Sequence, residues 1–384
     1  MLFSCGRLDS PPVNLSTCRK KSCDQGCDFL QVELLTAAPP FCPLAKNKSR
    51  DLNSHVIFYL QVEVLTAATP RKTDICDSGE LKALIDSVNF DAVLDFSSYK
   101  LSELKRVLPH LLKRTHLYVF ISSDSVYEVC EQSFPVRDSR EEDDIRPKDE
   151  EQIKLLKRRD SYGHHKLKCE EYLREKCKES GTNFVCLRLA DVIGPGDATE
   201  RWWQLQLWLN ACLNLGLSLN LPSSLQGKSL SFVYVKDVAQ LVVDLVMIAH
   251  SGGSSHILNQ SYNLAFREKV TLHQLLLLMN SELSKEEHID IEYSDDAAIP
   301  QYFPSVERGP VDVSKATELL NWRPTSLMRA VHDTVMFYRD DVMCGDVFLD
   351  ERRSVYESLC DDFKSFKNRS QLRREVRRLL GLKR

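Results

Sequence analysis

The chain has 384 residues, 43% of them hydrophobic and 28% charged, which suits a globular protein with one large α/β core and a smaller lobe. Its net charge of −4 indicates no particular charged partner, and it holds no apolar window long enough to span a membrane. The opening residues, MLFSCGRLDSPPVNL, lack the basic and apolar regions of a secretory signal. We therefore expect a cytoplasmic protein without membrane contact.

Two similar phrases stand near the amino terminus. FLQVELLTAAPP occupies Phe29–Pro40 and YLQVEVLTAATP occupies Tyr59–Pro70, with nine of twelve positions identical. Apolar residues alternate in both copies, so each predicts a strand. Because further apolar residues precede the second copy, Val56–Leu65 is the better candidate for a strand lying parallel in a buried sheet. We expect Val56–Leu65 to be ordered and at least half buried, and Met1 to about Lys48 to be less ordered with few apolar contacts.

Cysteines are dense in the same region, where five of the thirteen fall within the first 42 residues. The five are Cys5, Cys18, Cys23, Cys27 and Cys42. Cys23 and Cys27 form a CxxxC pair, but no second close pair or neighbouring His completes a structural zinc site. The spacing favours reduced thiols, many of them buried as small hydrophobic groups, over a metal site.

From Asp74 onward, helical and strand-like patterns alternate. SGELKALIDSV, at Ser78–Val88, has apolar residues at helical spacing, and FDAVLDF, at Phe90–Phe96, is a short apolar run typical of a buried strand. The later candidates are a helix over 101–114, a strand over 116–123, a long helix over 160–181 that Gly181 closes, and a strand over 183–194. This alternation predicts an α/β fold with crossover units and a mostly parallel sheet.

Candidate catalytic residues gather where those strands end, as ligand sites do in open α/β sheets. Ser122 and Ser123 end the strand in FISSDSVYE, and Tyr162 and Lys166 lie four apart, on one face of the following helix. A phenol with a pKa near 10 is a poor base at neutral pH, and lowering that pKa by about three units requires about 4 kcal/mol. A nearby ammonium group can supply part of this stabilisation.

These motifs, in this order, resemble the extended short-chain dehydrogenase/reductase family, of the nucleotide-sugar epimerase and dehydratase type. The resemblance runs from about Asp74 to Tyr338. The segments that carry it are TDICD, FDAVLDFSSYK, FISSDSVYE, DSYGHHKLKCEEY, LRLADVIGPGD, SFVYVKDVAQLVV, YNLAFREKVTLHQLL and DVSKATELLNWRP. It implies a Rossmann-like, doubly wound parallel sheet with a smaller C-terminal substrate lobe.

The same resemblance assigns roles to residues of this chain. Tyr162 becomes the catalytic acid/base, Lys166 the residue that lowers its pKa and holds the nicotinamide ribose, and Ser123 the catalytic hydroxyl. The cofactor, NAD or NADP, is then expected along Asp74, Ile75, Phe96, Ser97, Lys100, Tyr162 and Lys166. The alternative interpretation for Phe96 and Ile75 is that they pack in the core, and for Lys100 that it is a solvated cation in a loop.

The resemblance also divides the chain and limits its partners. The expected units are an atypical segment over 1–70, the remaining Rossmann-like domain over 71–190, a substrate lobe over 191–340 from which the chain returns to the first domain, and a basic helical tail over 341–384. We expect a small-molecule substrate, with a nucleotide sugar as the first candidate and a homodimer as the candidate assembly, and we do not expect nucleic acid.

Three departures from the family pattern put the substrate in doubt. Asp124 stands where sugar-nucleotide dehydratases carry an acid, but Ser125 replaces the Glu that serves them as base, and Glu128 replaces the usual Gly. Leu230 occupies a place where many relatives carry an Arg that faces the substrate diphosphate. An ordinary UDP-sugar would therefore lack its usual bidentate contact.

The largest departure is the absence of the Gly-rich turn that receives the dinucleotide pyrophosphate in this family. The glycines before Tyr162 are Gly6, Gly26 and Gly79, and they form no such array. We interpret the first βαβ unit as degenerate or replaced by the doubled segment. Losing two or three charge-assisted hydrogen bonds would remove about 3–9 kcal/mol, compared with about 8 kcal/mol for micromolar binding.

Two charged stretches complete the sequence. Ser139–Asp160 is a charge-rich insertion that favours a solvated loop and short helix over a lid, and Glu351–Arg384 predicts an amphipathic helix with a basic face. We predict an NAD(P)-dependent oxidoreductase or epimerase acting on a sugar nucleotide or a related hydroxyl or carbonyl compound, possessing an impaired cofactor site. The alternative is a non-catalytic Rossmann-fold scaffold that binds RNA through its tail.

Overall fold

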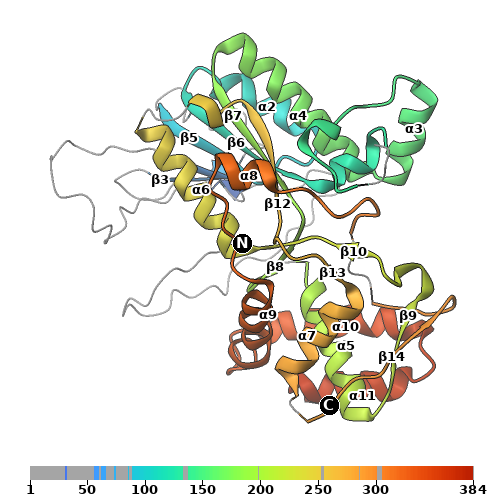
Figure 1. Cartoon of the computed structure of the whole chain (residues 1–384). Coiled ribbons are helices and arrows are strands. Elements are labelled where there is room, and N and C mark those ends of the chain that lie inside the picture. The colour runs from blue at the N-terminus through green and yellow to red at the C-terminus, as the bar shows by residue number, and fades with distance from the viewer. Residues whose placement is uncertain are drawn as a thin grey trace.

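The computed structural model describes residues 31–32, 56–59, 62–65, 73–74, 85, 89–132, 137–197, 199–251, 255–284, 286–300 and 305–383. A six-stranded sheet forms the upper half of the molecule in Figure 1, with the order β12-β7-β6-β5-β2-β3. Its strands are β2 (Val56–Tyr59), β3 (Val62–Leu65), β5 (Phe90–Asp95), β6 (Thr115–Ser123), β7 (Asn183–Leu189) and β12 (Gln260–Leu264). Five of the six run parallel to their neighbours, and only β3 is antiparallel.

Helices cover both faces of this sheet, as the alternating sequence pattern predicts. On one face, α2 (Leu101–Leu111) and α4 (Ser161–Ser180) pack their apolar side chains against alternate residues of the central strands, such as Tyr118 and Phe120. On the other face, α6 (Val235–His250) and α8 (Ser314–Leu319) cover the intervening residues, such as Val119. Both faces of the central strands are therefore buried, which is the environment expected of a parallel sheet.

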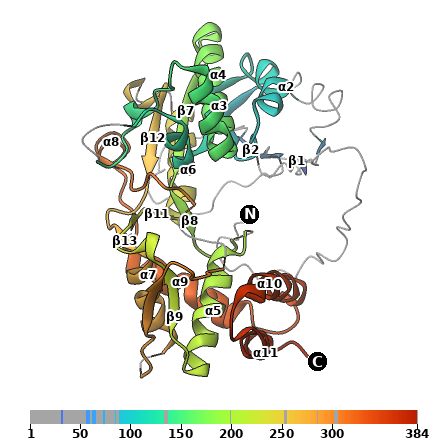
Figure 2. The same ribbon diagram turned by 90° about the vertical axis from the view of Figure 1, so that its right-hand side faces the viewer.

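The second lobe is largely helical and lies below the sheet (Figures 1 and 2). Its helices are α5 (Arg201–Leu215), α7 (Leu272–Leu283), α9 (Leu327–Met336), α10 (Leu349–Asp362) and α11 (Arg369–Leu379). Short strand pairs join them: β8 (Asp191–Ile193) with β11 (Phe232–Tyr234), β10 (Ser229–Leu230) with β13 (Val270–Thr271), and β9 (Leu219–Pro222) with β14 (Ile291–Ser294). The three Trp residues of α5 are buried at the centre of its core.

Short helical turns and one further helix complete the described elements. They are η1 (Asp124–Val129), η2 (Glu141–Asp143), α3 (Glu150–Arg159), η3 (Ser223–Leu225), η4 (Ser255–Ile257), η6 (Phe363–Ser365) and the π-helix η5 (Phe337–Asp341). The charge-rich insertion thus contains one turn, η2, and one short helix, α3. None of the described helices is both long and apolar enough to cross a bilayer.

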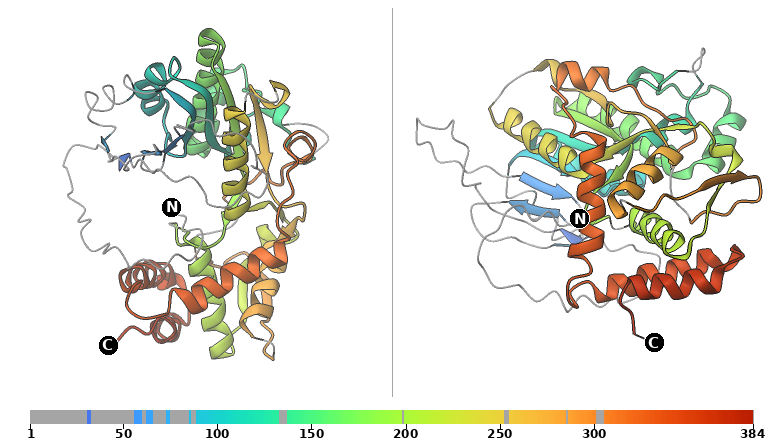
Figure 3. Two further views of the ribbon diagram at one scale, coloured as in Figure 1. Left: turned by 90° about the vertical axis from the view of Figure 1, so that its left-hand side faces the viewer. Right: turned by 60° about the horizontal axis from the view of Figure 1, so that its bottom comes forward.

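The second copy of the doubled phrase contributes to the sheet, but not as one strand. β2 runs parallel to β5, which confirms the expected strand in the vacant place of the sheet. The expectation of a single strand over Val56–Leu65 is wrong, because the chain reverses after Tyr59 and β3 returns antiparallel along β2 (Figure 3, right). Only two residues separate the strands, so a hairpin replaces the extension.

The described part of the first copy is the two-residue strand β1 (Gln31–Val32), which pairs antiparallel with β4 (Thr73–Asp74) in a separate two-stranded sheet. The side-chain burial of both copies, and the order expected of Met1 to Lys48, lie outside the described residues, as do the five N-terminal cysteines. Of the helix expected at Ser78–Val88, Ile85 is described, and it is helical and buried.

Two more sequence expectations need correction. The strand expected over 183–194 divides at Ala190 into β7, which belongs to the main sheet, and β8, which pairs with β11 and leads into the lobe. The single amphipathic helix expected over 351–384 is two helices, α10 and α11, that pack against α5. Both differences arise from tertiary contacts, since β8 and the two helices bury apolar residues in the core of the lobe.

Candidate active site

A cavity of about 610 Å³ opens at the carboxyl ends of β5, β6 and β7, between the sheet and the helical lobe. The sheet side contributes Phe96, Ser123 and Leu189, and α4 contributes Tyr162 and Lys166. Residues near the start of α5 and the loop around Ser305 close the lobe side. The three residues expected to be catalytic therefore line one cavity, although they come from two elements nearly forty residues apart.

Ser123 and Tyr162 meet directly. Ser123 ends β6, and its side chain hydrogen-bonds to the side chain of Tyr162 in the first turn of α4. The Ser123 hydroxyl also accepts a hydrogen bond from the amide of Ser125 at 3.1 Å and donates one to Asp124 Oδ1 at 3.2 Å. Both hydroxyl groups thus share one hydrogen-bonded chain at the cavity wall.

The approach of α4 to the turn after β6 depends on Gly163. A Cβ atom at this position would lie 2.1 Å from the carbonyl oxygen of Ser125, which is far inside van der Waals contact. The amide of Gly163 instead donates to Asp160 Oδ1 at 2.7 Å, where Asp160 caps the helix. The cap and the missing side chain together bring Tyr162 to Ser123.

Lys166 lies one turn further along α4 and is only 2% exposed. Its Nζ donates to the carbonyl oxygens of Ile121 at 2.8 Å and Ser98 at 3.0 Å. It also lies 4.8 Å from the ring centroid of Tyr99 and 5.9 Å from that of Tyr162. Desolvation lowers the pKa of Lys166, while the buried carboxylate of Asp95 opposes that shift.

The environment of Tyr162 favours its protonated form. Although 42% of its side-chain surface is exposed, the phenol lies within the cavity walls, and desolvation there raises its pKa well above the ordinary value. The neighbouring Tyr99 and Asp124 raise that pKa further, whereas the hydrogen bond with Ser123 lowers it. Tyr162 is therefore placed to donate a proton, and to accept one it needs additional positive charge nearby.

Asp95 organises the loop that carries the expected cofactor residues. Its Oδ1 accepts from the amides of Ser97 and Ser98, at 3.0 and 2.9 Å, and its Oδ2 accepts from Tyr118 at 2.7 Å. This fixed turn directs the Ser98 carbonyl at Lys166. Ser97 is buried, and its hydroxyl has no hydrogen-bond partner among the residues that the structure describes.

The remaining cofactor residues are spread more widely. Phe96 lines the cavity and also packs against the core under α6. Its position is thus compatible with cofactor binding and with core packing. Lys100 is exposed at the start of α2 and does not line the cavity. Asp74 lies on β4, apart from the six-stranded sheet, and Ile75 lies outside the described residues.

The residues present suit the nicotinamide end of a dinucleotide. At the pyrophosphate end, the chain has a different topology from that of a typical dinucleotide site. Ser123, Tyr162, Lys166 and the unpartnered Ser97 hydroxyl suit the nicotinamide and its ribose. The pyrophosphate normally lies on the amides of a helix that follows the first strand. Here β2 leads through two non-glycine residues into the antiparallel β3, so no helix begins there.

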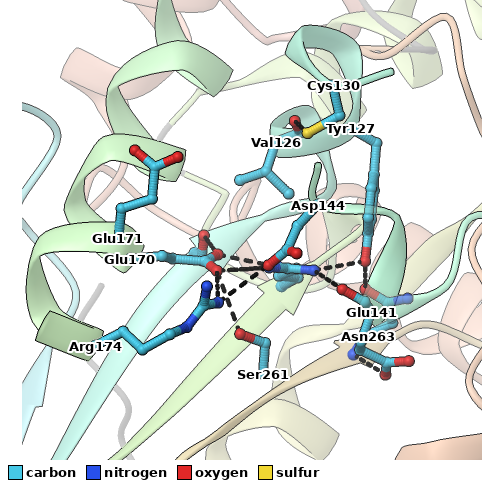
Figure 4. A network of polar contacts seen from close by, with 12 residues as sticks. Val126, Tyr127, Cys130, Glu141, Asp144, Glu170, Glu171, Arg174, Ser261 and Asn263 are labelled. Atoms are coloured by element: carbon cyan, nitrogen blue, oxygen red, sulfur yellow. Dashed lines mark hydrogen bonds and ion pairs between the residues drawn. The ribbon is translucent and has the colours of Figure 1, made fainter. Parts of the chain in front are cut away.

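A buried ion-pair network, drawn in Figure 4, joins α4 to β7 and reaches Ser122 beside the candidate catalytic Ser123. Arg188, at 0% exposure in β7, holds Glu170 of α4 through both carboxylate oxygens, at 2.7 Å for the shortest contact. Glu170 also accepts from Ser122 at 2.5 Å, immediately before Ser123. Arg188 extends the network to Asp144 at 2.6 Å and to the hydroxyl of Tyr127 at 2.9 Å.

The sequence analysis did not identify this network, although the sequence contains its signals. Glu170 follows Lys166 by four residues and therefore shares the face of α4 that carries Tyr162. Arg188 interrupts the apolar strand NFVCLRL, where a charge must find a buried partner. A charged residue on each of two buried surfaces could have suggested an ion pair between them.

Charged residues on the lobe side of the cavity were also missed. Arg201 of α5 contacts Asp191 of β8 at 2.8 Å, and Arg159 at the end of α3 contacts Glu128 of η1 at 3.2 Å. Arg159 also contacts Glu307. The charge-rich insertion therefore ends at the cavity, where sequence pattern favoured only a solvated loop.

The fold and this cavity define a Rossmann-type α/β protein with a Ser–Tyr–Lys group at the carboxyl edge of its sheet. A sequence profile described as the NAD dependent epimerase/dehydratase family matches residues 44–265, more than half of the chain. The chain belongs to this family, which is of the extended short-chain dehydrogenase/reductase type. The match begins after the first copy of the doubled phrase and includes the second.

Solved structures of the same fold support the assignment. A UDP-glucose 4-epimerase from Thermotoga maritima matches with a TM-score of 0.51 and 18% identity, covering 78% of this chain and 89% of its own. A UDP-glucose 4-epimerase from Thermus thermophilus matches with a TM-score of 0.51 and 16% identity, covering 70% and 84%. The Bordetella bronchiseptica enzyme WbmH matches with a TM-score of 0.50 and 22% identity, covering 69% and 81%. No curated protein matches the chain.

Proposed function

We propose that this protein is an NAD(P)-dependent oxidoreductase or epimerase that removes and returns a hydride and a proton at a hydroxyl-bearing carbon of a sugar nucleotide or a related compound. The observation that carries the proposal is the convergence of Ser123, Tyr162 and Lys166 at one cavity. Family membership gives the cofactor class, and the similar structures, which include UDP-glucose 4-epimerases and a complex with NAD, support the substrate and cofactor classes.

The residues divide the work in a way that their contacts support. The substrate hydroxyl binds between Ser123 and Tyr162, whose hydroxyls already share a hydrogen bond. Tyr162 accepts the substrate proton as the carbon is oxidised and returns it as the carbonyl is reduced. Bound NAD or NADP would supply the hydride acceptor and donor at this site.

Lys166 supports this chemistry by electrostatics. Two carbonyl oxygens hold its Nζ in place, so its position does not depend on the substrate. Its positive charge favours the phenolate form of Tyr162 and thereby lowers the cost of proton acceptance, which burial otherwise increases. The third donor position of the ammonium group can contact the nicotinamide ribose.

The proposed function is tested by incubating the purified chain with NAD or NADP and a panel of nucleotide sugars and free sugars. The appearance of reduced nicotinamide reports hydride transfer, and NMR of the recovered sugar reports epimerisation. Turnover by the wild type that Tyr162→Phe abolishes supports the proposal. Equal turnover in both forms, or none with any substrate at millimolar cofactor, contradicts it.

A further inference from the structure

The charges around the cavity indicate which substrate it accepts. We infer that the lobe side of this cavity binds an uncharged, polyhydroxylated substrate and excludes substrates that carry phosphate. The inference rests on the proposed function and decides between the two substrate classes that the function leaves open.

The cations that line the described cavity are already engaged by the protein. Arg201 contacts Asp191 through Nη1 at 2.8 Å and donates from Nε to Thr199 at 3.1 Å. Arg159 is held between Glu128 and Glu307. Lys166 donates to two carbonyl oxygens. The charge of each arginine is therefore already compensated by at least one carboxylate, which reduces what either can contribute to binding a phosphate.

Carboxylates outnumber the cations around the same cavity. Four acidic residues, Glu128, Asp160, Asp191 and Glu307, line it together with the three basic residues Arg159, Lys166 and Arg201, and Asp124 is a fifth acidic residue whose burial favours its neutral form. A diphosphate entering from the lobe side would approach this excess of acidic groups in a partly desolvated space. Like charges in such a space repel strongly, and sites use this repulsion to reject the wrong ligand.

Asp124 adds a neutral polar group next to the reacting position. It is 4% exposed, its Oδ1 accepts from Ser123, and its Oδ2 has no protein partner. Burial and the nearby Asp191 raise the pKa of Asp124 well above its usual range, which favours the protonated acid. A protonated Oδ2 can donate a hydrogen bond to a substrate hydroxyl.

The lobe does not supply the cation that other family members use. Leu230, in the place expected for an Arg, is 3% exposed and packs in the hydrophobic core of the lobe. It neither lines the cavity nor leaves space there for a charged group. Sequence and structure thus agree that a diphosphate has no free cation waiting among the described residues of the cavity.

The test measures UDP-glucose binding by calorimetry to the purified full chain and to charge variants. Glu128→Gln and Glu307→Gln each remove a negative charge from the cavity and leave Arg159 with one carboxylate partner in place of two. We expect UDP-glucose to bind at least about tenfold more tightly to each variant than to the wild type. Glu307 is the safer position, because its side chain is 71% exposed and its loss disturbs little packing.

Glu151→Gln is the matched control. It removes the same charge from α3, but Glu151 is 80% exposed, pairs only with Lys154 among the described residues, and does not line the cavity. This variant should bind UDP-glucose like the wild type. Low-micromolar binding of UDP-glucose by the wild type, or no gain in the Glu307→Gln variant, overturns the inference.

The same experiment separates this inference from the proposed function. UDP-glucose binding is measured without turnover, so a gain in the variants supports the exclusion of phosphate even if no hydride transfer is ever found. Conversely, Tyr162-dependent oxidation of a nucleotide sugar as efficient as that of a free sugar overturns the inference and leaves the proposed function in place.

Discussion

The two halves of the site are built very differently. Around α4 and β6, each catalytic side chain is held by at least one protein hydrogen bond, and a buried network of charges lies directly behind them. On the β2 side, where the family places a strand, a Gly-rich turn and a helix, the chain instead forms the β2–β3 hairpin. The residues that we propose for the chemistry and the backbone that we propose for the cofactor are thus separate structures, and one can change while the other stays intact.

The largest effect should come from breaking the network behind the catalytic half. Glu170→Gln leaves the guanidinium of Arg188 buried without its main carboxylate, which we expect to cost about 3–5 kcal/mol of unfolding free energy. Urea unfolding measures the loss. Glu175→Gln, on an exposed position of the same helix, should change stability by less than about 0.5 kcal/mol. A loss below about 1 kcal/mol for Glu170→Gln would show that water or Asp144 compensates Arg188.

The next effect concerns the chemistry itself. Tyr162→Phe removes the proton-carrying hydroxyl but keeps the ring, so turnover of any substrate should fall by at least about 10²-fold. Lys166→Met should lower both cofactor affinity and rate, because it removes the charge that favours the phenolate. Steady-state kinetics measures both.

Tyr172→Phe provides the control for this loss. Tyr172 lies on the same helix, packs in the core against α2 and does not line the cavity. Its variant should retain wild-type turnover within about twofold. Unchanged activity in Tyr162→Phe would show that the Tyr162 hydroxyl does not carry the proton and that the residue is structural.

We expect the hairpin on the β2 side to make cofactor binding weak. Because β2 is followed by the strand β3 and not by a helix in the described part of the chain, we expect dissociation constants for NAD(H) and NADP(H) on the order of a hundred micromolar or more, about 100-fold weaker than micromolar binding. Calorimetry on the full chain measures them. A low-micromolar constant would mean that another part of the chain replaces the missing helix, and would end the contrast between the two halves.

The smallest effect is a pH dependence of stability from Asp124. Its pKa is higher in the folded chain than in the unfolded one, so the folded state binds the proton more tightly, and stability falls as the pH rises from the unfolded pKa towards the folded pKa. Asp124→Asn removes this loss. The stability of the variant relative to wild type should therefore increase with pH, by on the order of 1 kcal/mol per unit within that interval.

Unfolding curves at about pH 4 and about pH 8 measure this difference. Asp244→Asn, an exposed residue on α6 that bonds to Gln240, is the control and should show no such change between the two pH values. A constant difference between the Asp124 variant and wild type would indicate that Asp124 stays ionised when folded.

Much of the fold and of the catalytic group follows from local sequence patterns. The strands β5 and β6 and the helices α2 and α4 lie close to their predicted positions, because apolar periodicity and the caps at Asp160 and Gly181 are local signals. Tyr162 and Lys166 share a face of α4 by helical geometry alone. Their meeting with Ser123 follows from the rule that the ends of parallel strands share one edge of a sheet.

The sequence by itself determined the alternation of helices and strands, the family, the candidate Ser–Tyr–Lys group and the absence of a Gly-rich turn, since each depends on residues close together in the chain. Only the tertiary structure decided the rest: the reversal after Tyr59, the pairing of Glu170 with Arg188, and the meeting of Arg159 with Glu128 and Glu307. The two ion-pair contacts join segments that lie far apart in the chain, so no single local pattern specifies either pairing. Burial decides the pairing of Glu170 with Arg188, because a charge removed from water must find its partner wherever the packed chain provides one.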